Sequence, residues 1–327
     1  MAGEGDSDRV RQHQARQEQA LRAAWLYYVA GRTQDEIAAQ LNTSRQGAQR
    51  LVSRAVAEKL IRFRFDHPIG ACMELGEALV ERFGLRHCHI VPSDPLMTGN
   101  SAAIAIAGAQ YLEHWFAQRA PMVIGFSTGR TLRAIAEEMA PVDAPQHKVF
   151  SLCGTMAWNG RAGWYEPLMR VVERTGAQLF PMPTPVVAAT IEERDLVQSQ
   201  RPFQMLRTLA EDARCLMVGV GHVGWQAPLH QGGFITDAEL TELIEAGAVG
   251  EIASRSFNAQ GVFISSPVND RVIALPLSMH PNCVRIGVGG GLSKVVALRA
   301  ALTGQAINAL ITDEATAAAI LQRRTNS

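Results

Sequence analysis

The sequence has no apolar run that approaches the roughly 18 consecutive residues needed for a membrane-spanning helix. Its first residues, MAGEGDSDRVRQHQARQEQ, also lack the apolar core of a secretory signal peptide. Both absences are typical of a cytoplasmic protein, so we expect no membrane partner.

Paired cysteines are absent as well. The five cysteines lie more than ten residues apart, so no CxxC pair exists to form a zinc or redox site. His87 and His89 flank Cys88 on an expected strand and would share one face, which makes a metal pair conceivable. No third ligand lies near them in sequence, and packed histidines are the favoured interpretation. We expect neither a metal nor a cofactor.

There is no net charge, because 31 basic side chains balance 31 acidic ones. The balance hides a division, since residues 1–65 carry 11 basic and 7 acidic side chains while the remainder carries 20 and 24. A basic head on an acidic body indicates that the head binds a polyanion. A solvated helix face could carry the same charges.

The basic head has the pattern of three helices. Apolar residues between 18 and 30 recur at helical spacing, and Gly31 can end that helix. Thr33 with Glu36 forms a capping box, Asn42 tolerates a left-handed turn, and Ser44 can cap a second helix over 44–61. The residues expected to be buried are Leu21, Ala24, Trp25, Tyr28 and Val29, then Ile37, Ala38 and Leu41, then Ala48, Leu51, Val52, Ala55, Val56 and Leu60.

This arrangement predicts a helix-turn-helix that reads DNA. The second helix would present its polar side chains to the major groove, where Gln can pair with adenine and Arg with guanine. Gly47 would allow close approach to the DNA backbone, and the alternating residues 61–65 would form a strand that touches phosphate. The alternative is a small helical bundle with a basic surface. The expected DNA-binding residues are Thr33, Ser44, Arg45, Gln46, Gln49 and Arg50.

A second domain follows a linker at residues 66–70, which gives a helix-turn-helix domain at 1–65 and a larger domain at 71–327. From residue 71, amphipathic helices alternate with short apolar runs. The pattern predicts an α/β fold whose mainly parallel sheet is covered by helices on both faces. The runs lie near 88–91, 122–125, 149–152, 180, 215–221 and 285–291.

The loops that follow these runs are candidate ligand sites, because parallel sheets bind ligands at the carboxyl ends of their strands. The segment 125–131, GFSTGRT, has the small residues and helix start that suit a phosphate. A tight turn with a capping hydroxyl is the competing interpretation. Gly154 follows the next run, and the glycines at 287–291 precede Lys294, which could supply a cation.

Three segments resemble the SorC/DeoR family of sugar-responsive transcriptional regulators. They are TQDEIAAQLNTSRQGAQRLVSRAVAEKLI, GFSTGRTL and GGLSKVVALRAALTGQAINALITDEATAAAIL. The resemblance implies an effector domain of the sugar-phosphate isomerase-like (NagB/RpiA/CoA transferase-like) type, a sugar, polyol or sugar phosphate as ligand, and a homotetramer on operator DNA. The effector-binding residues it implies are Gly125, Ser127, Thr128, Gly129, Arg130, Thr131, Gly154, Glu251, Gly289, Gly290 and Lys294.

The sequence departs from the family in one segment. Glu251 stands where the family usually has Asp, and Asn258 stands where an Asp often follows an aromatic residue. These changes leave the identity of the sugar end of the ligand undetermined. The aromatic residues near 25–28 and Trp158, Trp164 and Trp225 resemble the polyol-responsive branch.

The rival interpretation is a sugar-phosphate isomerase-like enzyme with a DNA-binding-like appendage. Such an enzyme needs a poised acid or base, and the candidates near glycine loops are His222, Glu251 and Asp313. Asp313 is better interpreted as the cap of the last helix. We therefore expect a ligand-controlled regulator, a dimer or tetramer that represses a carbohydrate or polyol operon, and no enzymatic activity.

Overall fold

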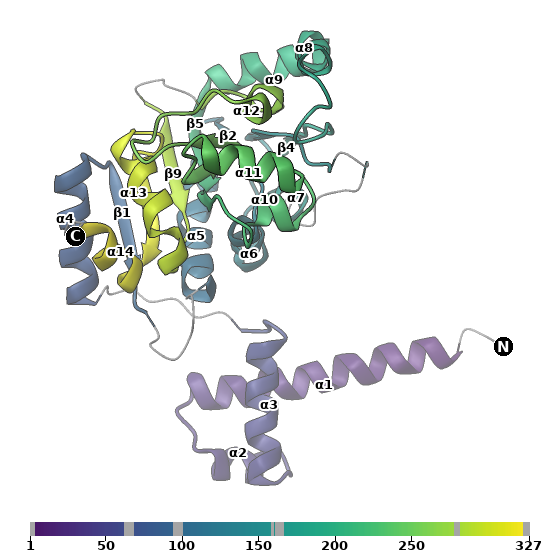
Figure 1. The fold of residues 1–327 in the computed structure, drawn as a ribbon. Coiled ribbons are helices and arrows are strands. Elements are labelled where there is room, and N and C mark those ends of the chain that lie inside the picture. Colours follow the sequence, from purple (N-terminus) through teal and green to yellow (C-terminus); the bar gives the residue numbers. More distant parts are fainter. Residues whose placement is uncertain are drawn as a thin grey trace. The chain divides into compact units, whose positions relative to one another are not determined.

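The computed structural model describes residues 4–61, 69–93, 101–157, 160, 167–277 and 282–322. The chain divides into two compact units, residues 1–67 and 68–327 (Figure 1). The first unit contains three helices in its described part, α1 (Glu4–Tyr28), α2 (Gln34–Gln40) and α3 (Arg45–Ala57). The expected strand at 61–65 lies outside the described residues except for Ile61.

Helix α1 packs through its small residues. The large apolar residues expected inside are on the surface of this chain, with Leu21 46% exposed, Trp25 55% and Tyr28 46%, and Val29 follows the helix and is exposed too. That prediction was wrong for these four residues and right for Ala24, because alanine side chains let helices approach most closely. The buried residues of α1 are Ala20, Ala23, Ala24 and Leu26, which contact α2 and α3.

Helix α3 is shorter than expected. It ends at Ala57, and Lys59 adopts a left-handed conformation with φ 53° just beyond it. Val56 is exposed, which contradicts its expected burial, whereas Ala48, Val52 and Ala55 are buried. The buried positions follow the helical repeat that faces α1 and α2.

The second unit begins with α4, which starts at Gly70, so that residue belongs to a helix and not to a linker. Among the described residues no helix is both long enough and apolar enough to cross a membrane. Its helices are α4 (Gly70–Phe83), α5 (Ser101–Phe116), α6 (Arg130–Glu138), α7 (Leu168–Thr175), α8 (Ile191–Ser199), α9 (Arg201–Glu211), α10 (Pro228–Gln231), α11 (Asp237–Glu245), α12 (Pro267–Arg271), the 3-10 helix η1 (Leu292–Lys294), α13 (Val295–Thr303) and α14 (Glu314–Leu321).

A seven-stranded parallel sheet forms the centre of this unit, in the order β1-β10-β9-β5-β2-β3-β4. The strands are β1 (His87–Val91), β2 (Val123–Phe126), β3 (Lys148–Ser151), β4 (Gln178–Phe180), β5 (Ala213–Gly219), β9 (Val284–Val288) and β10 (Ala309–Asp313). In the sheet, β3 and β4 lie on one side of β2, whereas β5, β9 and β10, which come later in the chain, lie on the other side of it. The strand order therefore reverses between β2 and β5.

Both faces of the sheet are buried, as predicted for an α/β fold (Figure 1). Along β5, Leu216 and Val218 belong to one apolar cluster, and Cys215 and Met217 belong to the other. Helices α4, α9, α11, α13 and α14 contribute to the first cluster, and α5, α6 and α7 contribute to the second. The alternation is what a strand covered on both sides requires.

Two parts of this fold were not predicted. Strand β10 pairs with both β1 and β9, although the sequence pattern predicted no strand at residues 309–313. A small antiparallel sheet also forms from β6 (Gly221–His222), β7 (Gly250–Ile252) and β8 (Arg255–Phe257). Strands of two or three residues are too short to produce a readable alternation.

Candidate functional site

The starts of α2 and α3 have the expected capping geometry. The Thr33 backbone N–H donates to Glu36 Oε2 over 2.8 Å, and the Glu36 N–H donates to Thr33 Oγ1 over 3.3 Å. The hydrogen bond from the Thr33 backbone lowers the pKa of Glu36. Asn42 adopts the predicted left-handed conformation with φ 54°, and the Ser44 hydroxyl accepts from Gly47 N–H over 3.0 Å. These contacts fix the start of both helices.

The outward face of α3 is polar. Arg45, Gln46, Gln49 and Arg50 are all exposed, while Ala48 on the opposite side is buried. The Arg45 Nε lies 3.9 Å from the Asp35 carboxylate, a distant and exposed pair that leaves the guanidinium accessible to another anion.

Two residues of the expected DNA-contact segment have local roles. The Thr33 hydroxyl donates to Glu36 over 3.0 Å while it accepts from Glu36 N–H, so both of its functions are used inside the cap. A Cβ at Gly47 would lie 2.2 Å from Thr43 Oγ1. The glycine is therefore explained by close packing within the turn, without reference to DNA.

The loop after β2 is tied to the end of β5, across the point where the strand order reverses. The buried Ser127 hydroxyl accepts from Gly219 N–H over 3.0 Å, and Ser127 N–H donates to the Met217 carbonyl over 3.1 Å. Helix α6 then begins after Gly129, and no side chain in the described part of the chain caps this end. Its first N–H groups are therefore available to an anion.

Titratable side chains from four separate elements interact electrostatically beside this helix end. Burial lowers the pKa of Lys294. Of the two nearby charged groups, Glu251 raises this pKa and Arg130 lowers it. Burial also lowers the pKa of His222, with Lys294 and Arg130 acting in the same direction. Arg130 begins α6, His222 ends β6, Glu251 lies on β7 and Lys294 ends η1. The topology thus brings together residues that are more than 160 positions apart in sequence.

The Glu251 carboxylate lies against the backbone of the adjacent strand. A Cβ on Gly221 would come within 2.0 Å of Glu251 Oε1, and Glu251 Oε2 accepts from Ser254 N–H over 2.8 Å. Burial raises the pKa of Glu251, against the hydrogen bond from Ser254 and the attraction of Lys294. The Nδ1 atom of His222 is buried, and none of the described residues forms a hydrogen bond with it.

Several glycines of the expected site are explained by packing. A Cβ on Gly154 would lie 2.2 Å from the Pro185 carbonyl, and one on Gly125 would lie 2.6 Å from Phe150 Cζ. A Cβ on Gly289 would lie 3.4 Å from Lys294 Nζ. The chain at 289 thus runs directly beside the Lys294 ammonium group.

Asp313 serves as a structural anchor. Its carboxylate accepts from Thr316 N–H over 2.9 Å, as predicted for a helix cap, and from Gly291 N–H over 3.1 Å. A Cβ on Gly290 would lie 2.1 Å from the same carboxylate. The Ser93 hydroxyl donates to it over 3.1 Å. Asp313 therefore holds the loop that leads to Lys294, a role that sequence reasoning missed.

The remaining histidine and aromatic candidates are His87, His89 and three tryptophans. His87 and His89 share a face, with ring centroids 6.4 Å apart, and burial lowers the pKa of each. Among the described residues, no group of three His, Cys, Asp or Glu side chains could hold a metal ion. Trp225 is 49% exposed, and Trp158 and Trp164 lie outside the described residues.

Comparisons with known proteins agree with this architecture. A protein-family model described as "Putative sugar-binding domain" matches residues 67–322. The chain is 34% identical to the erythritol catabolism regulatory protein EryD of Brucella abortus, over 92% of this chain and 96% of that protein. It is 31% identical to the deoxyribonucleoside regulator of Bacillus subtilis, over 94% and 98% of the two chains.

Solved structures give the same fold. The full-length sorbitol operon regulator SorC from Klebsiella pneumoniae matches with a TM-score of 0.70 at 20% identity, over 94% of this chain and 99% of that one. The similar proteins are named transcriptional regulators and not enzymes, which rejects the isomerase interpretation. The chain belongs to the SorC/DeoR family of ligand-responsive transcriptional regulators of carbohydrate catabolism.

Proposed function

We propose that this regulator reads operator DNA through α3 and is released by an effector bound at the carboxyl edge of the parallel sheet. The observation that carries the proposal is one chain with both an exposed Arg/Gln face on α3 and a cationic group of residues beside the uncapped start of α6. The two features lie in separate compact units, residues 1–67 and 68–327, which we assign as the two domains.

In the DNA-binding unit, Arg45, Gln46, Gln49 and Arg50 would contact base edges and phosphates. The Ser44 hydroxyl accepts from Gly47 and keeps its own proton for a phosphate oxygen. Thr33 acts mainly by fixing the start of α2, because its hydroxyl is occupied by Glu36. This placement is typical of a recognition helix whose N-terminal half enters the major groove.

In the effector unit, the anionic end of a ligand would bind at the start of α6, where Thr128, Gly129 and Thr131 offer N–H and hydroxyl groups beside Arg130 and Lys294. Ser127, Gly125, Gly154, Gly289 and Gly290 shape the loops around that position through the packing described above. Glu251 would accept hydrogen bonds from ligand hydroxyls.

The effector class is a polyol or sugar, free or phosphorylated. The name of EryD refers to erythritol catabolism, which supports a four-carbon polyol or its phosphate as the first candidate. Three cationic or titratable side chains against one carboxylate favour the phosphorylated form.

We further propose repression in the cytoplasm by a homodimer or homotetramer. A dimer with two recognition helices must match DNA half-sites about 34 Å apart or a multiple of that distance. An effector that rotates the subunits changes the distance between the two recognition helices and so lowers the affinity for operator DNA. Because the coupling is reciprocal, bound DNA lowers the affinity for the effector by the same factor.

Two substitutions test the separation of the sites. Arg45→Ala should weaken operator binding and leave effector affinity unchanged, whereas Thr128→Val should weaken effector binding and leave operator affinity unchanged. Operator binding is measured by fluorescence anisotropy and effector binding by calorimetry. If either substitution reduced both affinities equally in a folded protein, the model of two separate sites would be wrong.

A further inference from the structure

The small antiparallel sheet beside the candidate effector site contains a strained turn. Strands β7 and β8 pair Ile252 with Arg255, which leaves only Ala253 and Ser254 to form the turn. Both have positive φ values, 49° and 66°, a conformation that favours glycine or asparagine in two-residue hairpins. Such strained residues persist only where surrounding contacts hold them, and they gather at functional sites.

One contact that holds this turn comes from the site itself. Glu251 Oε2 accepts the Ser254 N–H over 2.8 Å, so the carboxylate closes the turn from within β7. The same side chain lies against Gly221 and attracts Lys294. The position of the Glu251 carboxylate at the effector site therefore depends on the geometry of this hairpin.

The outer edge of the hairpin is held by backbone and by a side chain. Residues 262–264 pair antiparallel with β8, with Ile264 N–H donating to the Ser256 carbonyl over 3.1 Å and Asn258 N–H donating to the Val262 carbonyl over 3.0 Å. The buried Asn269 amide also pairs with both backbone groups of Ser256. Asn269 Oδ1 accepts from Ser256 N–H over 2.8 Å, and Asn269 Nδ2 donates to the Ser256 carbonyl over 2.8 Å and to the Ile264 carbonyl over 2.7 Å. All hydrogen-bonding groups of the amide except one lone pair are thus used.

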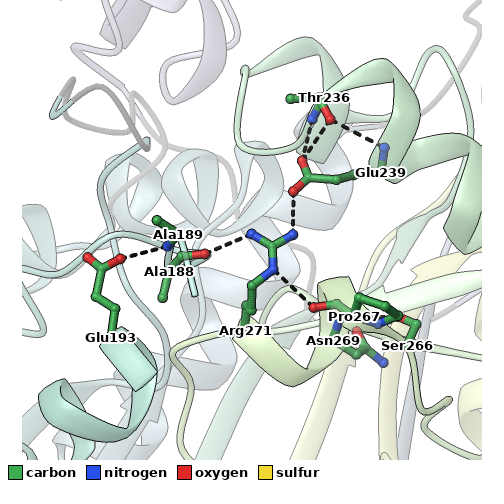
Figure 2. A network of polar contacts seen from close by, with 9 residues as sticks. All are labelled: Ala188, Ala189, Glu193, Thr236, Glu239, Ser266, Pro267, Asn269 and Arg271. Atoms are coloured by element: carbon green, nitrogen blue, oxygen red, sulfur yellow. Dashed lines mark hydrogen bonds and ion pairs between the residues drawn. The ribbon is translucent and has the colours of Figure 1, made fainter. Parts of the chain in front are cut away.

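Asn269 is in turn fixed by the helix that carries it. Ser266 caps α12 by accepting Asn269 N–H over 3.1 Å. Two residues further on, Arg271 donates to the Ala188 carbonyl over 2.8 Å, to the Pro267 carbonyl over 3.1 Å, and pairs with Glu239 of α11 (Figure 2). Helix α12 is therefore anchored on both sides while its Asn269 side chain holds β8.

We infer that Asn269 is a positioning residue for effector recognition, because its amide holds the β7–β8 hairpin that keeps the Glu251 carboxylate against Gly221 and Ser254 at the candidate effector site. The ligand group that depends on it is a hydroxyl of the polyol or sugar, not the anionic end, which the loop at 127–131 would bind. This inference rests on the proposed function of the site.

The test uses the full-length protein and two probes, erythritol 4-phosphate and inorganic phosphate, measured by calorimetry. Asn269→Ala should lower the affinity for erythritol 4-phosphate at least tenfold and change the affinity for inorganic phosphate less than twofold. In a Glu251→Gln background, Asn269→Ala should cause less than a twofold further loss, because the carboxylate it positions is already gone. Asn269→Asp, which loses both donations and keeps the acceptor, should repeat the pattern if the alanine variant does not fold.

Asn308→Ala is the matched control. Asn308 also bonds two backbone groups, Arg285 N–H over 2.7 Å and the Cys283 carbonyl over 3.0 Å, but precedes β10 at the amino edge of the sheet. It should leave both probe affinities unchanged. An equal loss for both probes, or an undiminished loss in the Glu251→Gln background, would overturn the inference alone. Failure of the wild-type protein to bind either probe would overturn the proposed effector class and this inference together.

Discussion

The Ser127 hydroxyl accepts a hydrogen bond from the Gly219 backbone N–H over 3.0 Å. This bond joins the loop after β2 to the end of β5, the two strands between which the order of the sheet reverses. Open α/β sheets bind ligands at such a point. Ser127 therefore shapes the proposed effector site without needing to touch the ligand.

Replacing Ser127 with Ala should destabilise the effector unit and weaken effector binding. The partly buried Gly219 N–H would lose its acceptor, which costs up to about 1–3 kcal/mol. We expect the melting temperature measured by calorimetry to fall by several degrees, with effector affinity reduced and operator affinity in the absence of effector retained. An unchanged effector affinity would contradict the role assigned to this bond.

Arg45→Ala should weaken operator binding and reduce its dependence on salt. If Arg45 neutralises one phosphate, the slope of log K against log salt should become shallower by about 1. Arg207→Ala on α9, also an exposed arginine, is the matched control and should change neither value. Equal effects of the two substitutions in anisotropy titrations would show that binding responds to total charge alone.

Effector binding should strengthen as the pH falls from 8 to 6.5 if the effector is anionic. Burial, Lys294 and Arg130 all lower the pKa of His222, so the ring is neutral in the free protein at pH 7. A bound anion favours the protonated ring, so binding takes up protons and becomes tighter at lower pH. His222→Gln should flatten the profile measured by calorimetry; a persistent slope would exclude His222 as its source.

His222 should also affect stability, in the opposite direction. Because its pKa is lower in the folded state than in the unfolded chain, the unfolded state takes up its proton first as the pH falls. The free energy of unfolding should therefore decrease as the pH falls through about 6.5, the ordinary value of histidine. Urea unfolding of the wild type and of His222→Gln at pH 8 and pH 6 measures the difference.

Gly154→Ala should strongly destabilise the protein. The new Cβ would lie 2.2 Å from the Pro185 carbonyl oxygen, so backbone must move to accommodate it. Gly70→Ala is the control, because nothing lies within 4 Å of its Cβ position at the start of α4. We expect Gly70→Ala to be neutral or slightly stabilising, by up to about 1 kcal/mol. Similar unfolding midpoints for both variants would contradict this packing argument.

Sequence reasoning predicted the features that depend on local chemistry. The capping box at Thr33, the left-handed Asn42, the cap at Asp313 and the apolar runs of the six predicted parallel strands are all confirmed. Each depends on a short segment whose residue types leave few alternatives. The anion loop at 125–131 stays a prediction, although its position at the reversal of the sheet agrees with it.

The features that were missed depend on partners distant in sequence. Helical spacing alone predicts a buried face of α1 that includes Trp25 and Tyr28, and only the presence of α3 selects the alanines. Strand β10 needs β1 and β9 beside it. Asn269 had a readable signal in the capping sequence Ser266-Pro267-Val268-Asn269, but nothing in it points to Ser256.

The central claim is that one ligand at the sheet edge controls one DNA-reading helix. Fluorescence anisotropy of the purified protein on its own upstream DNA tests it most directly, across a salt series and with a panel of sugars, polyols and their phosphates. The account predicts tight, salt-sensitive binding that one polyol or polyol phosphate releases in the wild type but not in Thr128→Val. Binding no tighter than to a random duplex, or specific binding that no member of the panel changes, would contradict it.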